Sequence, residues 1–466
     1  MPNSRGDAGW RRGTGLPSVG ARTGRTASAR RLALDVLWRV ETTDAFANLL
    51  LDARLADTHL SRPDRALATE LVYGVLRWRG KLDWILTPLL DRPLDQVDPI
   101  VRLLLRLGTY QIACLTRIPS FAAVDETVSL ARAVAPRGVG YVNAVLRAVA
   151  RTPEQAGPEA AADPLGYWSG MGSHPAWLAG RWLERLGTLE AGELMAANNQ
   201  MPSVSVAVNR LKTDPEVARA RIRKAGREPT TSRFFPEMLI LENGGNPADL
   251  PGFADGLLVP MDEGGALPVH ALDLAPGQRV LDACAGGGGK TALIAGALGG
   301  TGEVVALDQS PRAIRRLSAA SARLGLATVQ PTIYDARGAR TLFPGRFDRV
   351  LLDAPCSGLG TVRRRPEIKW RRRLDDLSRL ALLQQALLAG VAGALAPGGL
   401  LVYSTCSLEP EETDSVMTAF LASHPEFTLE PPPDILQPFR EGMVLRAWPH
   451  RHGTDGFFVA RLRKGT

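Results

Sequence analysis

Apolar residues recur at the spacing of an α-helix through the first third of the chain, most clearly over residues 32–40 and 103–110. Such spacing is typical of helices that bury one face. No alternating strand pattern interrupts it, and prolines fall where helices start or loops begin. The pattern predicts an all-α domain over residues 29–151 with about six to eight helices.

A different pattern follows a Pro-, Ala- and Gly-rich linker at residues 152–164. A short helical region runs to about Asn198, Val204, Val206 and Val208 alternate as in a strand, and a helix follows Asp214. A second strand is expected over 238–241. These elements predict a small α+β module over residues 165–270, which we expect to bind RNA.

From residue 276 onward, strand patterns alternate with helical ones. The strands are expected at residues 279–283, 303–307, 328–333, 347–352 and 399–404, with a final antiparallel pair at 427–430 and 456–462. Alternation of this kind predicts a parallel, doubly wound sheet. The layout is that of a Rossmann-like, seven-stranded methyltransferase domain, assigned to residues 271–466.

Charge and cysteine content indicate the kind of partner and the cellular compartment to expect. Lys and Arg outnumber Asp and Glu by 56 to 48, which favours a polyanionic partner. Residues 1–28 are basic and poor in branched apolar residues, so they predict a disordered leader. The four cysteines show neither disulfide nor metal-site spacing, and no apolar run is long enough to span a bilayer. We expect a monomeric cytoplasmic protein that binds neither a metal nor a membrane.

A glycine-rich turn joins the first strand of this domain to a helix. Glycines let a ligand approach the backbone closely, and the helix N-terminus offers unpaired NH groups. A nucleoside triphosphate loop requires a glycine where this chain has Cys284, whereas a dinucleotide pattern, GxGxxA, is matched from Gly287. The predicted cofactor-binding residues of this loop are Cys284, Ala285, Gly286, Gly287, Gly288, Gly289 and Lys290.

Two aspartates follow the next two strands. Asp308 lies 19 residues after Gly289, where a carboxylate accepts the hydroxyls of an adenosine ribose. Asp335 follows the third strand and is a candidate for the adenine amino group. Both positions suit NAD and S-adenosyl-L-methionine equally well.

Cys356 and Cys406 each follow a strand-like apolar run. Cytosine C5 is a poor nucleophile, so methyl transfer to it requires prior addition of a thiolate at C6. A base must then remove the C5 proton while the thiolate leaves. Asp353 precedes Cys356 and suits the amidine edge of the base. The residues themselves leave open which thiol adds to the ring.

Four stretches carry a family resemblance: Asp-Ala-Pro-Cys-Ser-Gly-Leu-Gly at 353–360, Arg-Pro-Glu-Ile-Lys-Trp at 365–370, Tyr-Ser-Thr-Cys-Ser at 403–407 and His-Gly-Thr-Asp-Gly-Phe-Phe at 452–458. With them, the chain resembles the bacterial rRNA cytosine-5 methyltransferases of the Sun/Nop group. The resemblance implies S-adenosyl-L-methionine as cofactor, also bound by Asp353, and a NusB-like RNA-binding domain at residues 29–151. It also implies Cys406 as nucleophile and Cys356 as the thiol that assists product release. The cofactor loop departs from the family at Gly286 and Gly287, where Ala-Pro is usual.

A basic cluster follows the Cys356 turn. Its predicted RNA contacts are Arg363, Arg364, Arg365, Lys369 and Arg371. Arginines beside the site suit the phosphates that flank a flipped base, although runs of charge are more commonly solvated loops.

Three function classes compete. An NAD-dependent oxidoreductase explains the glycine loop but not the two cysteine turns. A non-catalytic NusB-like RNA-binding factor explains neither the loop nor the thiols. We therefore expect methylation of C5 of a cytosine in 16S rRNA, with tRNA as the alternative substrate.

Overall fold

The computed structural model describes residues 28–153, 157–242 and 245–466. The predicted leader lies outside these ranges except for Ser28. The chain divides into two compact units: the first ends at Asn199 and also takes in Arg365–Arg371, and the second comprises Gln200–Arg364 and Arg372–Thr466. Within the described ranges, no helix combines the length and the apolar character that a membrane span requires.

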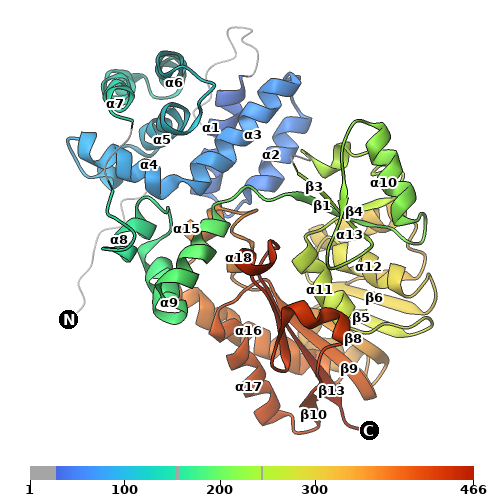
Figure 1. Cartoon of the computed structure of the whole chain (residues 1–466). Helices are drawn as coiled ribbons and strands as arrows, with labels where there is room; N and C mark the ends of the chain where they lie inside the picture. The colour runs from blue at the N-terminus through green and yellow to red at the C-terminus, as the bar shows by residue number, and fades with distance from the viewer. Residues whose placement is uncertain (1–27, 154–156, 243–244) are drawn as a thin grey trace. The chain divides into compact units, whose positions relative to one another are not determined.

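The first unit is helical, as predicted (Figure 1). Seven α-helices occupy its described residues up to Arg151: α1 (Ala29–Thr42), α2 (Ala47–Ala56), α3 (Arg62–Arg77), α4 (Arg79–Leu86), α5 (Pro99–Cys114), α6 (Ser120–Val134) and α7 (Val139–Arg151). Their apolar faces share one core, in which Leu34, Leu71 and Leu104 are fully buried. The helical spacing of the sequence thus packs as an all-α bundle.

Three further helices belong to the same unit: α8 (Pro164–Ser169), α9 (Ala176–Asn198) and α15 (Glu367–Arg371). Helix α9 is kinked at Gly187, whose φ of 75° is favourable only for glycine. Helix α15 comes from a distant part of the sequence. The segment predicted as part of the small α+β module is therefore divided, because α9 lies in the first unit.

The second unit begins with a four-stranded antiparallel sheet in the order β2-β3-β1-β4. Its strands are β1 (Val204–Val208), β2 (Thr230–Thr231), β3 (Met238–Leu241) and β4 (Leu258–Pro260), with helix α10 at Pro215–Lys224. Val206 of the central strand pairs with Leu239 on one side and Pro260 on the other. The predicted strands and helix of this module are confirmed.

The large sheet has the order β11-β12-β13-β9-β8-β5-β6-β7, and β10 also pairs with β13. Five strands are parallel: β5 (Arg279–Asp282), β6 (Glu303–Asp308), β7 (Val329–Ile333), β8 (Phe347–Asp353) and β9 (Leu395–Thr405). The antiparallel strands are β10 (Phe427–Leu429), β11 (Arg440–Glu441), β12 (Val444–Ala447) and β13 (Phe457–Lys464). The predicted Rossmann-like sheet is present, but it has nine strands instead of the predicted seven, because the sequence patterns missed β11 and β12. In the smaller sheet they also missed β2 and β4.

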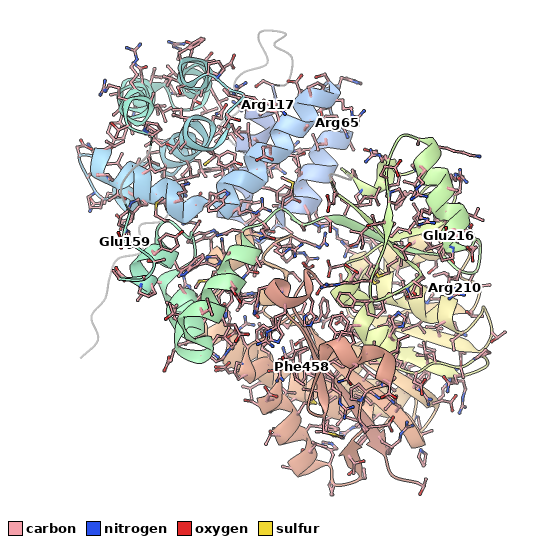
Figure 2. All side chains as sticks on the ribbon, viewed as in Figure 1. Arg65, Arg117, Glu159, Arg210, Glu216 and Phe458 are labelled. Carbon is pink, nitrogen blue, oxygen red and sulfur yellow. The ribbon has the colours of Figure 1, made fainter. Side chains whose placement is uncertain are left out.

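Both faces of the sheet are covered, which explains why its central strands are largely apolar. Val280 belongs to the core shared with α11 (Glu263–Ala271), α12 (Gly289–Ala297) and α13 (Pro311–Leu324). Leu281, the next residue, belongs to the opposite core with α14 (Ala339–Leu342), α16 (Leu374–Ala392) and α17 (Asp414–Ser423). Phe458, labelled in Figure 2, is fully buried on this second face.

Candidate functional site

Several of the predicted site residues lie at or next to the carboxyl ends of the parallel strands. Strands β5, β6 and β8 end at Asp282, Asp308 and Asp353, and β9 ends at Thr405, one residue before Cys406. Because the strands are parallel, these ends share one edge of the sheet. Ligands of open α/β sheets bind in the crevice at this edge.

The glycine loop between β5 and α12 leaves room for a ligand. A Cβ atom added at Gly286 or Gly287 would meet no heavy atom within 4 Å. Gly288 has a φ of 86°, and a Cβ there would lie 2.3 Å from a methyl carbon of Leu317, so only glycine fits. Cys284 is partly buried, and burial, followed by the charge of Asp282, raises the pKa of its thiol. The loop fits a cofactor through its backbone, while Cys284 stays an inert thiol.

Asp308 ties this loop to the neighbouring strand. Its two carboxylate oxygens accept hydrogen bonds from the backbone NH of Gly286, at 3.0 Å, and of Ser310, at 2.8 Å. Each oxygen keeps a lone pair for a further donor. The position is suitable for a ribose, and that role stays a prediction.

Asp335 already has a cationic partner. The Arg337 guanidinium donates to both of its carboxylate oxygens, at 3.0 and 3.1 Å from Nε, and this bond holds the pKa of Asp335 below its usual value. The pair is exposed, so solvent weakens it. A contact between Asp335 and adenine therefore stays a prediction, with Arg337 as a competitor.

Asp282 is a buried acid that the sequence patterns did not single out. It accepts a hydrogen bond of 2.6 Å from the Thr291 hydroxyl, in the first turn of α12. Burial raises its pKa to about 7, although the bond from Thr291 opposes that shift. Asp282 thus fastens the start of α12 beneath the glycine loop.

Lys290 links the cofactor loop to the Cys356 strand. Its ammonium lies 2.6 Å from Oδ2 of Asp353, whose Oδ1 accepts from the Ser404 hydroxyl at 2.8 Å. Burial disfavours the charged lysine, but the attraction of Asp353, with a smaller contribution from Cys406, raises its pKa overall. We expected Lys290 only as a loop residue. The structure instead places its ammonium beside Asp353 and within electrostatic range of Cys406.

The two predicted thiols are neighbours. The sulfur atoms of Cys356 and Cys406 lie 3.3 Å apart, within hydrogen-bonding distance, and both side chains are partly exposed. Their strands pair in parallel with Asp353 opposite Ser404, which brings the two turns together. The hydrogen bond to Cys406, followed by burial, raises the pKa of Cys356 well above its usual value. Cys356 therefore stays protonated at neutral pH.

The basic cluster has partners inside the protein. Arg363 is 5 % exposed and donates to the carbonyl of Gly453 at 2.8 Å. Arg364 bonds the carboxylates of Asp262 and Asp455. The Arg363 side chain is buried against the protein backbone, and its contact with RNA stays a prediction. Arg364 is anchored by two acids of its own unit.

Lys369 and Arg371 are likewise held within the helical unit. Lys369 has no exposed surface, and its ammonium donates to the carbonyl of Arg77 and to the side-chain oxygen of Asn199, each at 3.0 Å. Arg371 donates to three backbone carbonyls, including that of Val40 at 2.6 Å. Burial of Lys369 within the helical unit argues against its predicted RNA contact, which stays untested. Arg365 is exposed, so its contact with RNA stays a prediction.

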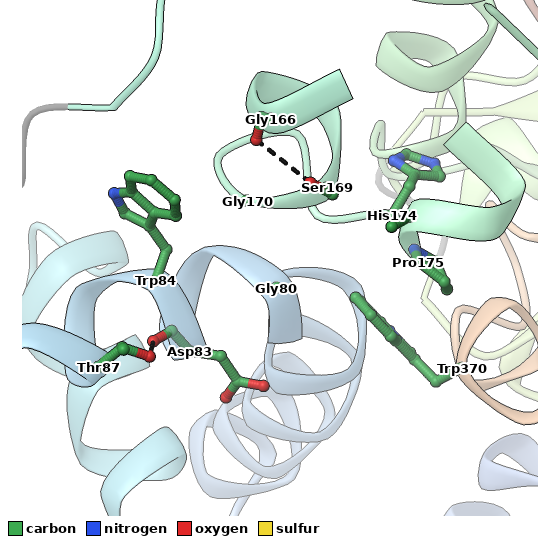
Figure 3. A pocket seen from close by; sticks show the side chains of 11 residues that line it. Gly80, Asp83, Trp84, Thr87, Gly166, Ser169, Gly170, His174, Pro175 and Trp370 are labelled. Carbon is green, nitrogen blue, oxygen red and sulfur yellow. Dashed lines mark hydrogen bonds between the residues drawn. The ribbon is translucent and has the colours of Figure 1, made fainter. Parts of the chain in front are cut away.

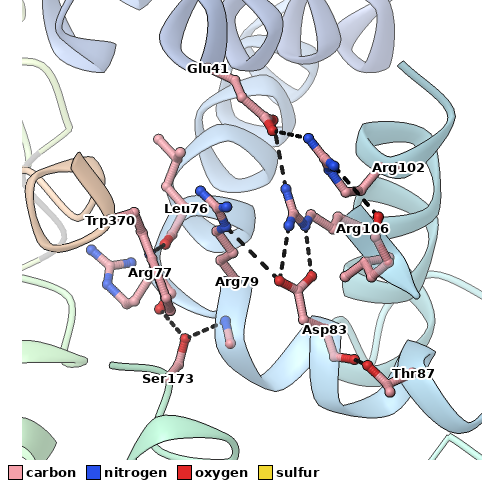
Figure 4. A network of polar contacts seen from close by, with 12 residues as sticks. Glu41, Leu76, Arg77, Arg79, Asp83, Thr87, Arg102, Arg106, Ser173 and Trp370 are labelled. Carbon is pink, nitrogen blue, oxygen red and sulfur yellow. Dashed lines mark hydrogen bonds and ion pairs between the residues drawn. The ribbon is translucent and has the colours of Figure 1, made fainter. Parts of the chain in front are cut away.

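Helix α15 and the neighbouring helices of the same unit make several polar contacts (Figure 4). Trp370 donates its indole NH to the carbonyl of Leu76 at 2.8 Å. Nearby, Arg106 makes a two-point bond to Asp83, at 2.7 and 2.9 Å, and is only 3 % exposed. The stretch that resembles a family motif at 365–370 thus has a structural role in the helical unit.

A pocket of about 340 Å³ also lies in the helical unit (Figure 3). Its lining includes Trp84, His174 and Trp370, with the backbone of Gly80 and Gly170. None of the predicted catalytic or cofactor-binding residues lines it. Within the described ranges, no group of three or more His, Cys, Asp or Glu side chains is placed to hold a metal ion.

Comparisons with known proteins agree with this geometry. The family model described as 16S rRNA methyltransferase RsmB/F matches residues 269–463, the NusB family model matches 27–151, and a ferredoxin-like domain model of RsmF/B-like methyltransferases matches 174–247. "Ribosomal RNA small subunit methyltransferase B" of Pseudomonas putida is 36% identical over 445 residues, covering 94% of this chain and 98% of the relative. The chain belongs to the RsmB/F family of rRNA methyltransferases.

A second curated relative and one solved structure are also similar to the chain. "Probable ribosomal RNA small subunit methyltransferase B" of Bacillus subtilis is 36% identical over 444 residues, which cover 94% of this chain and 99% of the relative. The crystal structure of PH0851 superposes with a TM-score of 0.82 at 27% identity, over 94% of this chain and all of that one. The cofactor of an RsmB/F enzyme is S-adenosyl-L-methionine, and its binding by the glycine loop stays a prediction. The NAD-dependent alternative is excluded.

Proposed function

We propose that this RsmB/F chain methylates C5 of a cytosine in 16S rRNA through a covalent adduct between Cys406 and C6 of the base. The observation that carries the proposal is the pair of thiols 3.3 Å apart at neighbouring strand ends. A methyltransferase that acts on a nucleophilic nitrogen or oxygen has no need of either thiol. Activation of a pyrimidine ring does require one.

Cys406 is the better candidate for the nucleophile. The raised pKa of Cys356 keeps that thiol protonated, so its SH can donate to the Cys406 sulfur. A thiolate is stabilised by such a donor and by a nearby cation. The ammonium of Lys290 supplies that cation, since Cys406 is among the groups that raise the pKa of Lys290.

The remaining groups fit the sequence of steps. The Cys406 thiolate adds to C6, and negative charge develops at C5 and over the ring, while Asp353 bonds the amidine edge of the base. S-adenosyl-L-methionine supplies the methyl group. C5 takes that methyl group, its proton then passes to water, and the C6–S bond breaks as the C5–C6 double bond reforms. The Cys356 thiol stabilises the departing Cys406 thiolate.

Small-subunit rRNA is the substrate we propose, because the curated relatives that match along nearly their whole length carry that substrate in their names. The net charge of +8 suits any RNA. A tRNA cytosine remains the alternative substrate, and a purely RNA-binding role leaves the paired thiols unexplained.

Bisulfite mapping tests the proposal. Small-subunit rRNA and tRNA from a deletion strain are compared with the same RNAs after complementation by the wild type or by Cys406→Ser. We expect one protected 16S cytosine that depends on the wild-type gene and is lost with Cys406→Ser. A protected cytosine that appears only in tRNA would transfer the activity to the alternative substrate, and no gene-dependent cytosine in either RNA would contradict the proposal.

A further inference from the structure

A buried carboxylate, Glu412, lies beneath the two thiol turns. It follows β9 in the short acidic stretch after Cys406, and its side chain has no exposed surface. A buried carboxylate is costly unless hydrogen bonds or a counter-charge replace its water. Among the ion pairs of the described residues, none involves Glu412, so neutral donors must stabilise it.

Those donors come from the neighbours of Cys356. Oε1 of Glu412 accepts from the backbone NH of Ser357 at 2.7 Å and from the Gln384 side-chain amide at 3.0 Å. Oε2 accepts from the Ser357 hydroxyl. The same Gln384 amide donates to the carbonyl of Pro355 at 3.1 Å. The residues directly before and after Cys356 are therefore both fixed by the Glu412–Gln384 pair.

The network also reaches the Cys406 turn. The hydroxyls of Ser357 and Ser407, each the residue that follows a cysteine, lie 3.2 Å apart. The Tyr403 hydroxyl donates to the backbone carbonyl of Glu412 at 2.8 Å and lies 3.1 Å from the side-chain oxygen of Gln384. Glu412 thus holds the Cys356 turn next to the Cys406 turn.

We propose that Glu412 is a positioning residue for product release, which keeps the Cys356 thiol against the Cys406 sulfur while the adduct breaks down. This inference rests on the proposed function. The Glu412 carboxylate bonds Ser357 directly, and Gln384 carries its second contact to Pro355, so both residues that flank Cys356 depend on it. Its links to Ser407 and Tyr403 on the Cys406 side are indirect. Its loss should therefore impair elimination, which needs Cys356, more than the addition and methyl transfer that Cys406 performs.

The test compares Glu412→Ala, Glu412→Gln and the wild type in single-turnover and steady-state assays with substrate RNA. We expect Glu412→Ala to bind S-adenosyl-L-methionine normally and to complete one methyl transfer. Its steady-state turnover should fall about tenfold or more, with a covalent protein–RNA adduct accumulating on denaturing gels. Glu412→Gln keeps one acceptor oxygen and the shape of the side chain, and should show a smaller defect of the same kind.

A matched control is Glu430→Gln, because the Glu430 carboxylate bonds Arg461 and Arg463 towards the opposite edge of the same sheet. It should lose stability without accumulating adduct. If Glu412→Ala does not fold, the turnover and adduct level of Glu412→Gln test the inference in its place. Wild-type turnover without adduct in the decisive variant would overturn the inference, as would a variant that loses methyl transfer together with the adduct.

A readout without RNA separates this inference from the proposed function. Diamide oxidises two adjacent thiols to a disulfide, and peptide mapping reports the Cys356–Cys406 bond. The bond should form about tenfold more slowly in the Glu412 variants if Glu412 positions the turn. An unchanged rate would count against the inference whatever the substrate is, whereas absence of 5-methylcytosine from wild-type reactions would count against the proposed function alone.

Discussion

Replacing Asp308 by alanine tests whether the second strand end holds the cofactor. The substitution removes the acceptor of two backbone NH groups, those of Gly286 and Ser310 at 3.0 and 2.8 Å. It also removes the proposed partner of the ribose hydroxyls. Hydrogen bonds to a charged group contribute about 1.5–3 kcal/mol each. Loss of one ribose contact then weakens S-adenosyl-L-methionine binding at least about tenfold, or about 1.4 kcal/mol.

Isothermal titration calorimetry measures this affinity directly. Asp348→Ala is the matched control, because Asp348 also accepts from a backbone NH, that of Arg279 at 2.8 Å, at the amino end of the same sheet. Both variants should unfold at lower temperature than the wild type, but only Asp308→Ala should lose affinity. Unchanged affinity in Asp308→Ala, or an equal loss in both variants, would refute a ribose site at Asp308.

Three further outcomes follow from buried polar groups. Burial raises the pKa of Asp282 to about 7 from an ordinary value of 3.8. Between these pH values the native state keeps a proton that the unfolded chain releases, so the free energy of unfolding falls as pH rises. Asp282→Asn should flatten this pH dependence, measured by urea unfolding across that range. Lys369→Met should reduce thermal stability and leave RNA affinity unchanged at fixed salt, because the Lys369 side chain bonds Arg77 and Asn199 within the protein. A selective loss of RNA affinity would instead show that Lys369 contacts RNA. Arg106→Met leaves Asp83 without its two-point partner and should lower the free energy of unfolding in urea by about 1.5–3 kcal/mol, because Asp83 is partly exposed. A loss below about 1 kcal/mol would mean that water replaces the bond.

The regular elements were predictable from the sequence because their patterns are local. Helical spacing over residues 32–40 became α1, and apolar runs of the right length became β5, β6 and β8. Strands β11 and β12 escaped prediction because they are short and are stabilised by pairing with β13 and with each other. Their sequence alone carries too little alternation to mark a strand.

The candidate site was predictable only in part. The glycine loop, the strand-end aspartates and both cysteines stand out as motifs. The bond between Lys290 and Asp353 spans 63 positions, so it depends on the order of strands in the sheet. Lys369 lies in a run of cations that is typical of a solvated loop, and its burial depends on Arg77, 292 positions away. Glu412 likewise lies in an acidic stretch, and only the packing of β8 against β9 places it under the thiols.

The central claim is that Cys406 adds to the base and Cys356 releases it. Denaturing gels of Cys406→Ala and Cys356→Ala, each incubated with substrate RNA and S-adenosyl-L-methionine, test it most directly. Cys406→Ala should form no covalent protein–RNA adduct and no 5-methylcytosine, whereas Cys356→Ala should methylate once and accumulate a stable adduct. An adduct that accumulates in Cys406→Ala and is absent from Cys356→Ala would contradict the assignment of the two thiols.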